Sequence, residues 1–545
     1  MSGAARPRLA FVSPLPPVRS GISDYSTDLL PHVAQDFAVE VFVDERHPLL
    51  REGEYQSLPV HPPQELRRRI REFAHVVYQM GNNLHHRFVL ELASEMPGIV
   101  VLHDIVLHHL YEGIAGVEDA WDAYGRALRD SYGRVGERVL SMKRWRLASE
   151  RENFALPLFE SLAAAGRGII VHSRRAEHEV RRRLPTLPVR RMPMGIPLAE
   201  SVDRVGARRR LGVGDRAVIV ASFGFLIPTK RIDVLAAAFA QARRESPDLR
   251  LVLIGEESPG TDLGALFSAD DFASGRVVHR GYVSAVEYRD WMAATDVAVN
   301  LRFPTAGETS ASLLRLLGEG KCTLVSAYRQ FLEIPPEAAV RIPLGKDEEE
   351  TLARELVALA RDQARRARIG AAARAFIAAE HSMAAAARGF REAVTAIAAS
   401  PPAASPRPPL WRSPKTSRSA SIAGSTVPAG LAQLVLGPRA ATEIEICVRN
   451  DGDSRWISAA EPFGGHVAVG AEIIGEQGGV AMSLRPVSPM HDVEPGGEVV
   501  VRFLLEAPDR PGVYRVRPVL VHAGREHRIL LGSALDLNVR ADVPS

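Results

Sequence analysis

The fold is decided by an apolar strand that runs into a turn rich in Pro and Gly and then into a helix: Leu9-Ala10-Phe11-Val12-Ser13-Pro14-Leu15-Pro16-Pro17-Val18-Arg19-Ser20-Gly21-Ile22-Ser23-Asp24-Tyr25. A short apolar run followed by a helical pattern is typical of a βαβ unit, in which helices cover parallel strands. Gly21 lies at the expected helix N-terminus, where backbone N–H groups and the helix dipole attract an anion. A simple tight turn explains the same residues. The turn lacks the G-x-G-x-x-G spacing of a dinucleotide-binding loop, which argues against an NAD enzyme.

The same alternation of apolar runs and helical patterns fills two successive stretches of the chain. In the first stretch, apolar runs lie at 8–12, 38–43, 75–79, 99–102 and 169–171, and helical patterns at 121–146 and 149–165. In the second, runs lie at 217–223, 250–254, 276–279, 296–300, 322–326 and 339–342, and helical patterns at 231–245, 285–294 and 309–319. The cluster Pro193-Met194-Gly195-Ile196-Pro197 between them suits an interdomain turn. We therefore expect an α/β fold of two doubly wound, Rossmann-like domains, over 1–197 and 198–398, that face a cleft with one substrate on each wall.

The rest of the chain has a different composition. Residues 350–398 are rich in Ala, Arg and Glu and look helical, whereas 399–428 are dominated by Pro, Ser, Ala and Arg, as in a flexible linker. Short alternating segments follow at 431–436, 443–449, 466–472, 498–505, 513–521 and 528–539. Turn signals such as Asn450-Asp451-Gly452 separate them. This rhythm predicts an all-β sandwich over 429–545, of about immunoglobulin-domain length.

The composition is that of a globular protein with several cores, since 46% of the 545 residues are hydrophobic and 24% are charged. A formal net charge of +3, with basic and acidic residues interspersed, argues against a nucleic-acid-binding protein. Cys322 and Cys447 lie in different expected domains, which fits a reducing compartment. Because no secretory signal or membrane-spanning run is visible, we expect a cytoplasmic protein. The stretch Arg67–Arg71 could contact the inner membrane surface, although a solvated helix face explains it more simply.

The first loop resembles the N-terminal loop of family-4 glycosyltransferases, which are retaining enzymes of the GT-B fold, because residues 16–25 read P-P-x-x-S-G-I-x-D-Y. The resemblance continues in Gln79-Met80-Gly81-Asn82-Asn83, in Val101-Leu102-His103-Asp104 and in the block from Asp296 to Lys321, and it covers about residues 8–397. The segment Val448–Gly452 with Trp456 resembles Ig-like modules of bacterial surface-polysaccharide enzymes, and we expect Trp456 in the core of the sandwich. The resemblance implies a bacterial enzyme whose donor is a sugar joined to a nucleoside diphosphate.

The loop that begins at Gly224 is the first expected donor element. Departure of the diphosphate needs cations or N–H dipoles near its developing charge. In the family this loop carries an Arg and a Lys that clamp the pyrophosphate. Lys230 matches the Lys, but Phe225 occupies the Arg position, so the second cation is missing or supplied elsewhere, for example by Arg231. A solvated loop charge is the alternative interpretation of Lys230.

The block around residues 300–320 is the second expected donor element, because its helix N-terminus can hold the donor sugar and phosphate. The residues that we assign to donor binding there are Arg302, Gly307, Thr309, Ser310 and Arg315. The family has two Glu residues eight positions apart, where Gly307 and Arg315 stand here, and Glu308 is displaced by one. We expect Glu308 to reach donor sugar hydroxyls, and Arg315, seven residues on, to reach a phosphate or to pair with Glu308. A helix N-terminal charge is the alternative interpretation of Glu308.

Residues of the first domain are expected to face the reacting carbon and the acceptor. His103 matches a family His near the reacting sugar carbon and is expected to orient the sugar rather than act as a strong base. The expected acceptor contacts are Asp24, Tyr25, Asn82 and Asp104. Adjacent His pairs at 85–86 and 108–109 point in different directions on a helix and lack a matched carboxylate cluster, so we expect no metal and no cofactor.

The sequence therefore predicts a hexosyltransferase that uses a nucleotide sugar, retains the anomeric configuration and modifies a saccharide or lipid-linked acceptor in cell-surface polysaccharide or glycolipid synthesis. One alternative is a GT-B sugar-nucleotide epimerase, which needs two paired acid/base residues and no acceptor site. Another is a degenerate GT-B protein that acts as a scaffold, which Phe225 and Arg315 favour.

Overall fold

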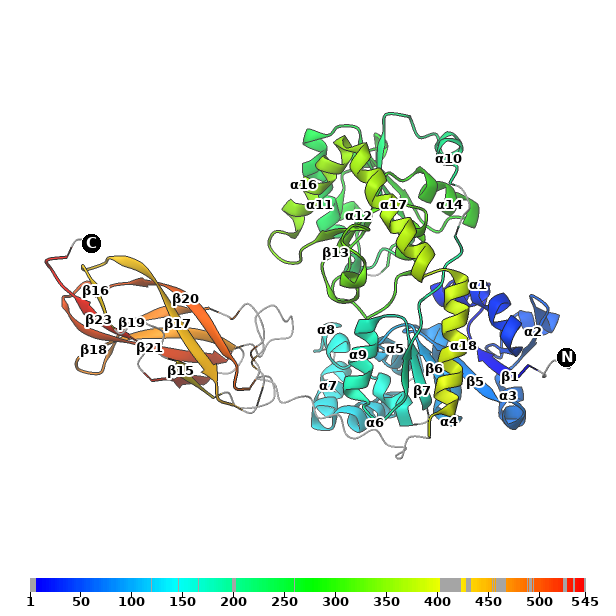
Figure 1. Cartoon of the computed structure of the whole chain (residues 1–545), viewed down its shortest axis with the longest axis horizontal. Helices are drawn as coiled ribbons and strands as arrows, with labels where there is room; N and C mark the ends of the chain where they lie inside the picture. Colours follow the sequence, from blue (N-terminus) through cyan, green and yellow to red (C-terminus); the bar gives the residue numbers. More distant parts are fainter. Residues whose placement is uncertain are drawn as a thin grey trace. The chain divides into compact units, whose positions relative to one another are not determined.

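The computed structural model describes residues 6–545 except 119, 146, 165, 199–201, 259, 402–422, 428–432, 453, 455, 457–466, 488, 490–492, 494, 523–526, 533–534 and 544–545. The chain forms two compact units, one of Met1–Leu140 with Leu156–Pro409 and one of Ser141–Ala155 with Leu410–Ser545. The first unit contains both Rossmann-like domains, and the second contains the C-terminal β-sheets (Figure 1).

The first domain is built on an eight-stranded sheet of order β3-β4-β2-β1-β5-β6-β7-β8, parallel except between β3 and β4. Its strands are β1 Arg8–Val12, β2 Ala38–Phe42, β3 Glu54–Tyr55, β4 Leu58–His61, β5 His75–Met80, β6 Gly98–Leu102, β7 Gly166–Val171 and β8 Val189–Arg191. All five residues of β6 are buried, as expected of a strand with helices on both faces. Each strand expected in this domain is confirmed, while the short β3, β4 and β8 were not expected.

The helices of this part of the chain, with 3₁₀ helices written η, are α1 Gly21–Asp36, α2 Leu49–Glu52, α3 Pro63–Arg69, η1 Ile70–Glu72, η2 Leu84–His86, α4 Arg87–Glu95, α5 His108–Glu118, α6 Trp121–Tyr132, α7 Arg134–Arg144, α8 Arg151–Ala155, η3 Phe159–Ala164 and α9 Arg174–Arg183. The helix expected over 121–146 is two helices, because Gly133 takes a left-handed φ of +56° that ends α6. The helix expected over 149–165 is likewise divided into α8 and η3.

The second domain has a six-stranded, wholly parallel sheet of order β11-β10-β9-β12-β13-β14. Its strands are β9 Val218–Phe223, β10 Leu249–Ile254, β11 Val277–Arg280, β12 Val297–Asn300, β13 Cys322–Ser326 and β14 Val340–Ile342. Its helices are α10 Arg204–Arg210, η4 Pro228–Lys230, α11 Ile232–Glu245, α12 Leu263–Leu266, α13 Ala269–Ala273, α14 Ala285–Ala294, α15 Ala311–Gly318, η5 Arg329–Glu333, α16 Glu348–Arg361 and α17 Gln363–Glu380. These strands and helices confirm the second expected Rossmann-like repeat.

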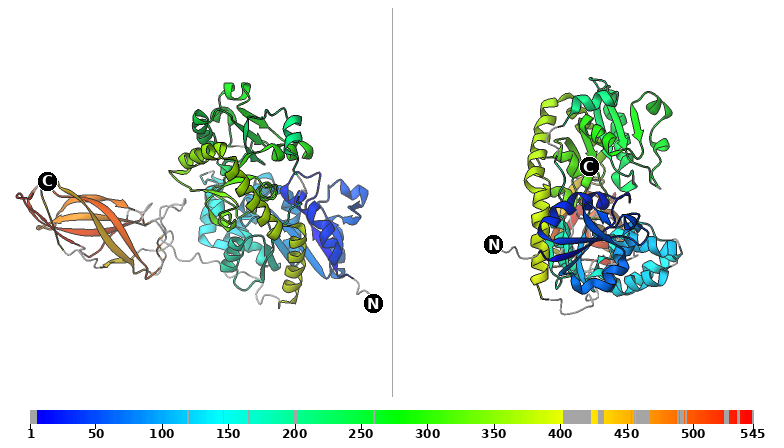
Figure 2. Two further views of the ribbon diagram at one scale, coloured as in Figure 1. Left: turned by 45° about the horizontal axis from the view of Figure 1, so that its top comes forward. Right: turned by 90° about the vertical axis from the view of Figure 1, so that its right-hand side faces the viewer.

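The helix that follows, α18 Met383–Ala399, returns to the first domain and packs against α1, β7 and β8 (Figures 1 and 2). The Phe390 ring lies 6.4 Å from Phe11 and 6.1 Å from Phe37, measured between centroids. The contacts of α18 therefore assign it to the first domain, although the expected boundaries of 198–398 placed it in the second.

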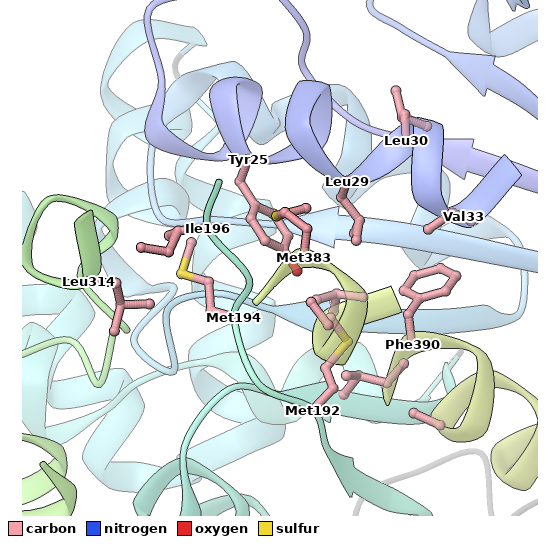
Figure 3. Close-up of a cluster of buried hydrophobic side chains, with 14 of the residues drawn as sticks. Tyr25, Leu29, Leu30, Val33, Met192, Met194, Ile196, Leu314, Met383 and Phe390 are labelled. Carbon is pink, nitrogen blue, oxygen red and sulfur yellow. The ribbon is translucent and has the colours of Figure 1, made fainter. Parts of the chain in front are cut away.

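A buried cluster joins the two domains where the chain crosses between them. Figure 3 shows Tyr25 of α1, Met194 and Ile196 of the crossover segment, Met383 of α18 and Leu314 of α15 in this cluster. Gly195 in the crossover cannot be replaced without movement, because a Cβ there would lie 2.6 Å from the Cβ of Ala386. The Pro/Gly cluster thus provides both the turn and a close approach to α18.

The second unit contains two sheets that share one hydrophobic core, which confirms the expected sandwich. One sheet has the order β15-β17-β20, with β15 Gly424–Val427, β17 Ala441–Asn450 and β20 Glu498–Glu506. The other contains β16 Gln433–Leu436, β18 Val467–Gly475, β19 Val480–Val487, β21 Gly512–His522, β22 His527–Leu530 and β23 Leu535–Val539. Trp456 is fully buried in this core, as expected. Most of the expected linker, residues 402–422, lies outside the described residues.

A buried charge network holds α9 against η3 in the first domain. The Arg183 guanidinium contacts Glu160 at 2.5 Å and Glu179 at 2.5 Å, and the Tyr132 hydroxyl donates to Glu160 at 2.7 Å. Burial by itself raises the pKa of Glu179, but the positive charges of Arg183 and Arg182 outweigh it and lower that pKa to about 2. Glu179 is therefore ionised at neutral pH, and the Arg183 guanidinium contacts the carboxyl groups of both Glu179 and Glu160.

We expect Arg183→Ala to destabilise the protein by about 3–5 kcal/mol, because it leaves Glu160 buried without its cation. Thermal unfolding of the full-length protein would show a large fall in the transition temperature of the Rossmann-like unit. Arg68→Ala is the matched control, since the Arg68 side chain is 75% exposed beside Glu65 and its pair contributes at most about 1 kcal/mol. Equal shifts for both variants would contradict the assigned role.

Candidate active site

Loops at the C-terminal ends of the parallel strands of the two domains contact each other. The loop after β6 meets the loop after β12 directly, because the Ala306 carbonyl accepts the N–H groups of Ile105 at 2.8 Å and Val106 at 3.1 Å. In open α/β sheets this edge is where ligands bind. The residues expected to act on donor and acceptor lie on or beside these two loops.

Lys230 lies in η4, directly after the first strand of the second sheet. Its side chain is 7% exposed, and its Nζ donates to the Phe223 carbonyl. Burial holds the pKa of Lys230 well below its usual range, the charge of Arg302 lowers it further, and Glu308 opposes both. Gly224 adopts a φ of +85°, and a Cβ there would lie 2.9 Å from Nζ. The expected donor loop is thus shaped around a single buried lysine.

Arg302 and Glu308 form an ion pair beside Lys230. The Arg302 Nε lies 3.0 Å from Glu308 Oε1, and the Thr305 hydroxyl donates to Glu308 Oε2 at 2.7 Å. Arg302 is 7% exposed, and its own backbone N–H donates to Ser326. The structure thus brings together Lys230, Arg302 and Glu308, each of which the sequence analysis assigned to the donor side.

Arg231 does not supply the second cation of the clamp in this structure. Its guanidinium binds both carboxylate oxygens of Glu348, at 2.7 and 3.4 Å, and the Glu348 residue is 2% exposed. Phe225, at the position of the family Arg, is 48% exposed. The cation that accompanies Lys230 is therefore Arg302, which reaches the site from the other donor element.

Arg315 pairs with Asp28 of α1 at 3.1 Å and not with Glu308. The expected pairing fails because α15 begins only at Ala311, with Ser310 as its cap, so Glu308 precedes the helix and does not share a helical face with Arg315. Thr309, between them, is half-buried in the loop. Arg315 instead connects the donor-side helix to the first domain. Asp24 lies exposed one turn before Asp28 on the same face of α1.

Asp104 is the acidic group of the first domain that faces the donor loop. Its Oδ2 accepts the Asn82 backbone N–H at 3.0 Å. Burial raises the pKa of Asp104 to about 7, the negative charge of Glu308 adds to the increase, and the bond from Asn82 opposes it. The Asn82 side chain is itself occupied, by His109 at 2.9 Å and by the Leu110 N–H at 3.2 Å, so it holds the turn together.

The raised pKa of Asp104 predicts a pH-dependent stability. Because the folded protein binds this proton more tightly than an unfolded chain, with its usual pKa of 3.8, folding stability is lost as pH rises from about 4 to about 7. Asp104→Asn has no carboxyl group at this position, so the variant does not lose this part of its folding stability as pH rises. We expect the difference in unfolding temperature, variant minus wild type, to grow over that range and to be constant above pH 7. A difference that does not change with pH would contradict the assignment.

His103 and Tyr25 face the interior of the first domain. His103 is 6% exposed, and its two ring nitrogens lie 2.8 Å from Gln79 Oε1 and 3.1 Å from His172 Nε2. Burial holds the pKa of His103 well below its usual range, so the ring is neutral at pH 7. Tyr25 is 2% exposed and packs edge-on against His103, with 5.3 Å between the ring centroids. Tyr25 belongs to the buried hydrophobic cluster and both His103 ring nitrogens have partners within the first domain, so the expected roles of these two residues stay predictions.

Gly21 is the first residue of α1, and nothing lies within 4 Å of the place where its Cβ would be. The Ser20 hydroxyl accepts the N–H of Ile22 at 3.3 Å and so satisfies one donor of the helix terminus. The structure therefore leaves open space beside Gly21, as a bound group would need.

The sequence analysis missed three polar residues, namely His172, Gln330 and Glu333. Gln330 and Glu333 belong to η5, a turn after β13 with no recognisable motif, and His172 follows β7 as a single histidine. A periodic pattern would not have identified them, because their hydrogen-bond partners lie far away in the sequence.

The described part of the chain holds no group of three or more His, Cys, Asp or Glu side chains that could bind a metal ion. None of its helices combines the length and the apolar composition that a membrane span needs. In the stretch proposed for a membrane surface, Arg67 pairs with Glu95 at 2.7 Å and Arg69 with Glu40 at 3.0 Å. These acidic partners favour the interpretation as a solvated helix face.

Comparison with known proteins identifies relatives of this architecture. Residues 231–392 match the family model described as glycosyl transferase-like. No curated protein matches the chain. Anabaena HepE, solved in complex with UDP and glucose, is 14% identical over 72% of this chain and 100% of its own, with a TM-score of 0.52. Sucrose-phosphate synthase from Thermosynechococcus elongatus is 17% identical over 72% and 99%, with a TM-score of 0.50. Together, the two parallel sheets and these matches show that the chain has the GT-B fold, and the segment that matches the glycosyl transferase-like model lies mostly in the second domain.

Proposed function

We propose that this protein is a glycosyltransferase that moves a hexose from a nucleotide-diphosphate sugar to a saccharide or lipid-linked acceptor. The observation that carries this proposal is the convergence of Lys230, Arg302 and Glu308 beside the loop that contacts the first domain. Two cationic groups suit a leaving diphosphate, and a carboxylate suits sugar hydroxyls.

The positions of these groups indicate which role each has in the transfer of the sugar. A diphosphate that enters beside Lys230 brings negative charge to a buried amine, which favours its protonated form at the moment when the leaving group needs a cation. We assign Asp104, a buried carboxyl of the first domain whose pKa is raised by burial and by the charge of Glu308, to the acceptor hydroxyl. We further propose that the transfer proceeds with retention and without a metal, because the leaving diphosphate itself takes the acceptor proton and the two cations replace a metal ion.

The binding partners of structural relatives support a uridine nucleotide as the first donor to test, since Anabaena HepE was solved with UDP-glucose. We propose a cytoplasmic role in cell-surface polysaccharide or glycolipid synthesis, with the C-terminal sandwich as an Ig-like accessory module. Both follow from the resemblance of the N-terminal loop and of the sandwich segment.

The test is a panel of nucleotide sugars incubated with the full-length protein, with and without saccharide and lipid-linked acceptors. We expect slow hydrolysis of one donor and faster transfer when its acceptor is present. Interconversion of sugar epimers with no acceptor would instead indicate an epimerase. The anomeric configuration of the product decides between retention and inversion.

A scaffold protein with a degenerate site is the second candidate, and two observations favour it. Phe225 leaves the family Arg position without a cation, and Arg315 is engaged by Asp28 rather than open to a ligand. Such a protein would release no nucleoside diphosphate from any donor. Binding of UDP without turnover would therefore support the scaffold.

A further inference from the structure

Glu308 is held by a hydrogen-bond network that reaches it from η5. The Gln330 side-chain amide donates from Nε2 to the Thr305 hydroxyl at 2.7 Å and to the Glu308 backbone carbonyl at 3.0 Å. Gln330 is 7% exposed and Thr305 is 1% exposed, so water cannot replace these bonds easily. The network is therefore a buried, ordered part of the candidate active site.

The orientation of the Gln330 amide is fixed by its partner. A backbone carbonyl can only accept a hydrogen bond, so the amide group beside the Glu308 carbonyl must be the NH₂. The opposite orientation would place two carbonyl oxygens against each other. In the orientation observed, Gln330 Oε1 is buried and has no partner among the described residues. The two hydrogen bonds that Gln330 Nε2 donates offset the cost of leaving Oε1 without a partner.

The Thr305 hydroxyl links the Gln330 amide to the Glu308 carboxylate and fixes the orientation of that carboxylate. Its oxygen accepts from Gln330 Nε2 and from the Gly307 backbone N–H, the latter at 3.0 Å. Both lone pairs are then used, and the single hydroxyl proton is left for Glu308 Oε2, 2.7 Å away. The remaining carboxylate oxygen pairs with Arg302.

The turn that carries Gln330 is anchored to the other domain as well. The Glu333 carboxylate, at the end of η5, accepts the N–H groups of Arg174 at 2.9 Å and Arg175 at 2.8 Å, at the N-terminus of α9. One five-residue turn thus contacts the donor loop of the second domain and a helix of the first. This turn therefore holds Gln330 between the two domains.

We propose that Gln330 is a positioning residue that holds the Glu308 carboxylate in its working orientation through Thr305. This inference rests on the proposed glycosyltransferase function. Gln330 touches neither donor nor acceptor in this role. It sets the direction of the hydroxyl proton that Glu308 receives, and so fixes which carboxylate lone pairs remain for the sugar.

The experiment compares Gln330→Met, which keeps the shape and removes both donations, with Thr305→Val and Thr305→Ser. In the full-length protein we expect Gln330→Met and Thr305→Val to lower kcat about tenfold to a hundredfold, the cost of misplacing one reacting contact. The dissociation constant for UDP should stay within about threefold, because diphosphate contacts are unchanged. Thr305→Ser, which retains the hydroxyl, should restore near wild-type kcat. Gln64→Met, on the exposed surface, is the matched control.

Hydrogen exchange provides a measurement that does not depend on activity. The Gly307 N–H loses its acceptor in Thr305→Val, and the loop loses its anchor in Gln330→Met, so amides in peptides covering 303–313 should exchange about tenfold faster. Unchanged kcat and exchange in both variants would overturn the inference, as would a change in the UDP dissociation constant alone. If the wild type transfers no sugar at all, the proposed function fails, and exchange alone decides whether Gln330 holds the loop. If Gln330→Met does not fold, Thr305→Val tests the same network.

Discussion

Lys230→Ala is expected to lower the turnover of the nucleotide sugar by about two orders of magnitude or more, comparable to the loss of one oxyanion donor in other enzymes. Lys230 is buried beside Arg302 and Glu308, and its pKa is held low by burial until a diphosphate arrives. Removing it leaves Arg302 as the remaining cation near the leaving group, and Arg302 is already paired with Glu308. The measurement is steady-state release of nucleoside diphosphate with the donor selected from the panel.

Lys346→Ala is the matched control for this experiment, because Lys346 is an exposed lysine of the same domain. It should leave turnover unchanged. The circular dichroism spectrum of Lys230→Ala should match that of the wild type, since Lys230 lies in the short η4 turn outside the hydrophobic clusters of the domain. Turnover near the wild-type level would remove Lys230 from the mechanism.

Gly307→Ala is expected to abolish most of the activity without unfolding either domain. Gly307 has a φ of +78°, which costs other residues about 1–2 kcal/mol, and its Cβ would lie 2.3 Å from Cγ1 of Ile105 on the opposite domain. The Ala306 carbonyl could then no longer accept from Ile105 and Val106. A displacement of about 1 Å there should lower kcat about a hundredfold.

The double variant Gly307→Ala with Ile105→Ala tests this explanation by restoring space. It removes Cγ1 and Cδ1 of Ile105 and leaves Cβ at 3.4 Å, an ordinary contact distance. We expect activity to recover at least about tenfold relative to the single Gly307 variant. Gly214→Ala, at a glycine with open space around it, should have no effect. Equal activity in the single and double variants would show that the loss has another cause.

Most of the fold could be predicted because the two Rossmann-like domains are made of strands buried on both faces. Such strands appear as continuous apolar runs, and each expected run coincides with a strand to within three residues at either end. Strands β3, β4 and β8 escaped prediction because they are short and contain polar or partly exposed residues, so no apolar run marks them. The division at Gly133 also escaped, since the apolar pattern continues across it and only its left-handed φ ends the helix.

The candidate site was predictable where function depends on residue type in a loop after a strand. Lys230, Arg302 and Glu308 were identified in that way, and the structure brings them together. The direction in which a side chain points was not predictable. The His103 ring is held by hydrogen bonds to Gln79 and His172, and Tyr25 packs into the hydrophobic cluster, neither of which the sequence shows. Pairing across the cleft was likewise not visible in the sequence.

The return of α18 to the first domain has a consequence for how the chain is made. The first strand leaves the ribosome early, but Phe390, which packs against Phe11, is translated 379 residues later, the difference between the two residue numbers. At about 5–20 residues per second, this delay is roughly 20–80 s. During that interval the α1 surface that α18 will cover is exposed on the nascent chain. The first domain is therefore completed only after the second domain, although its synthesis begins first.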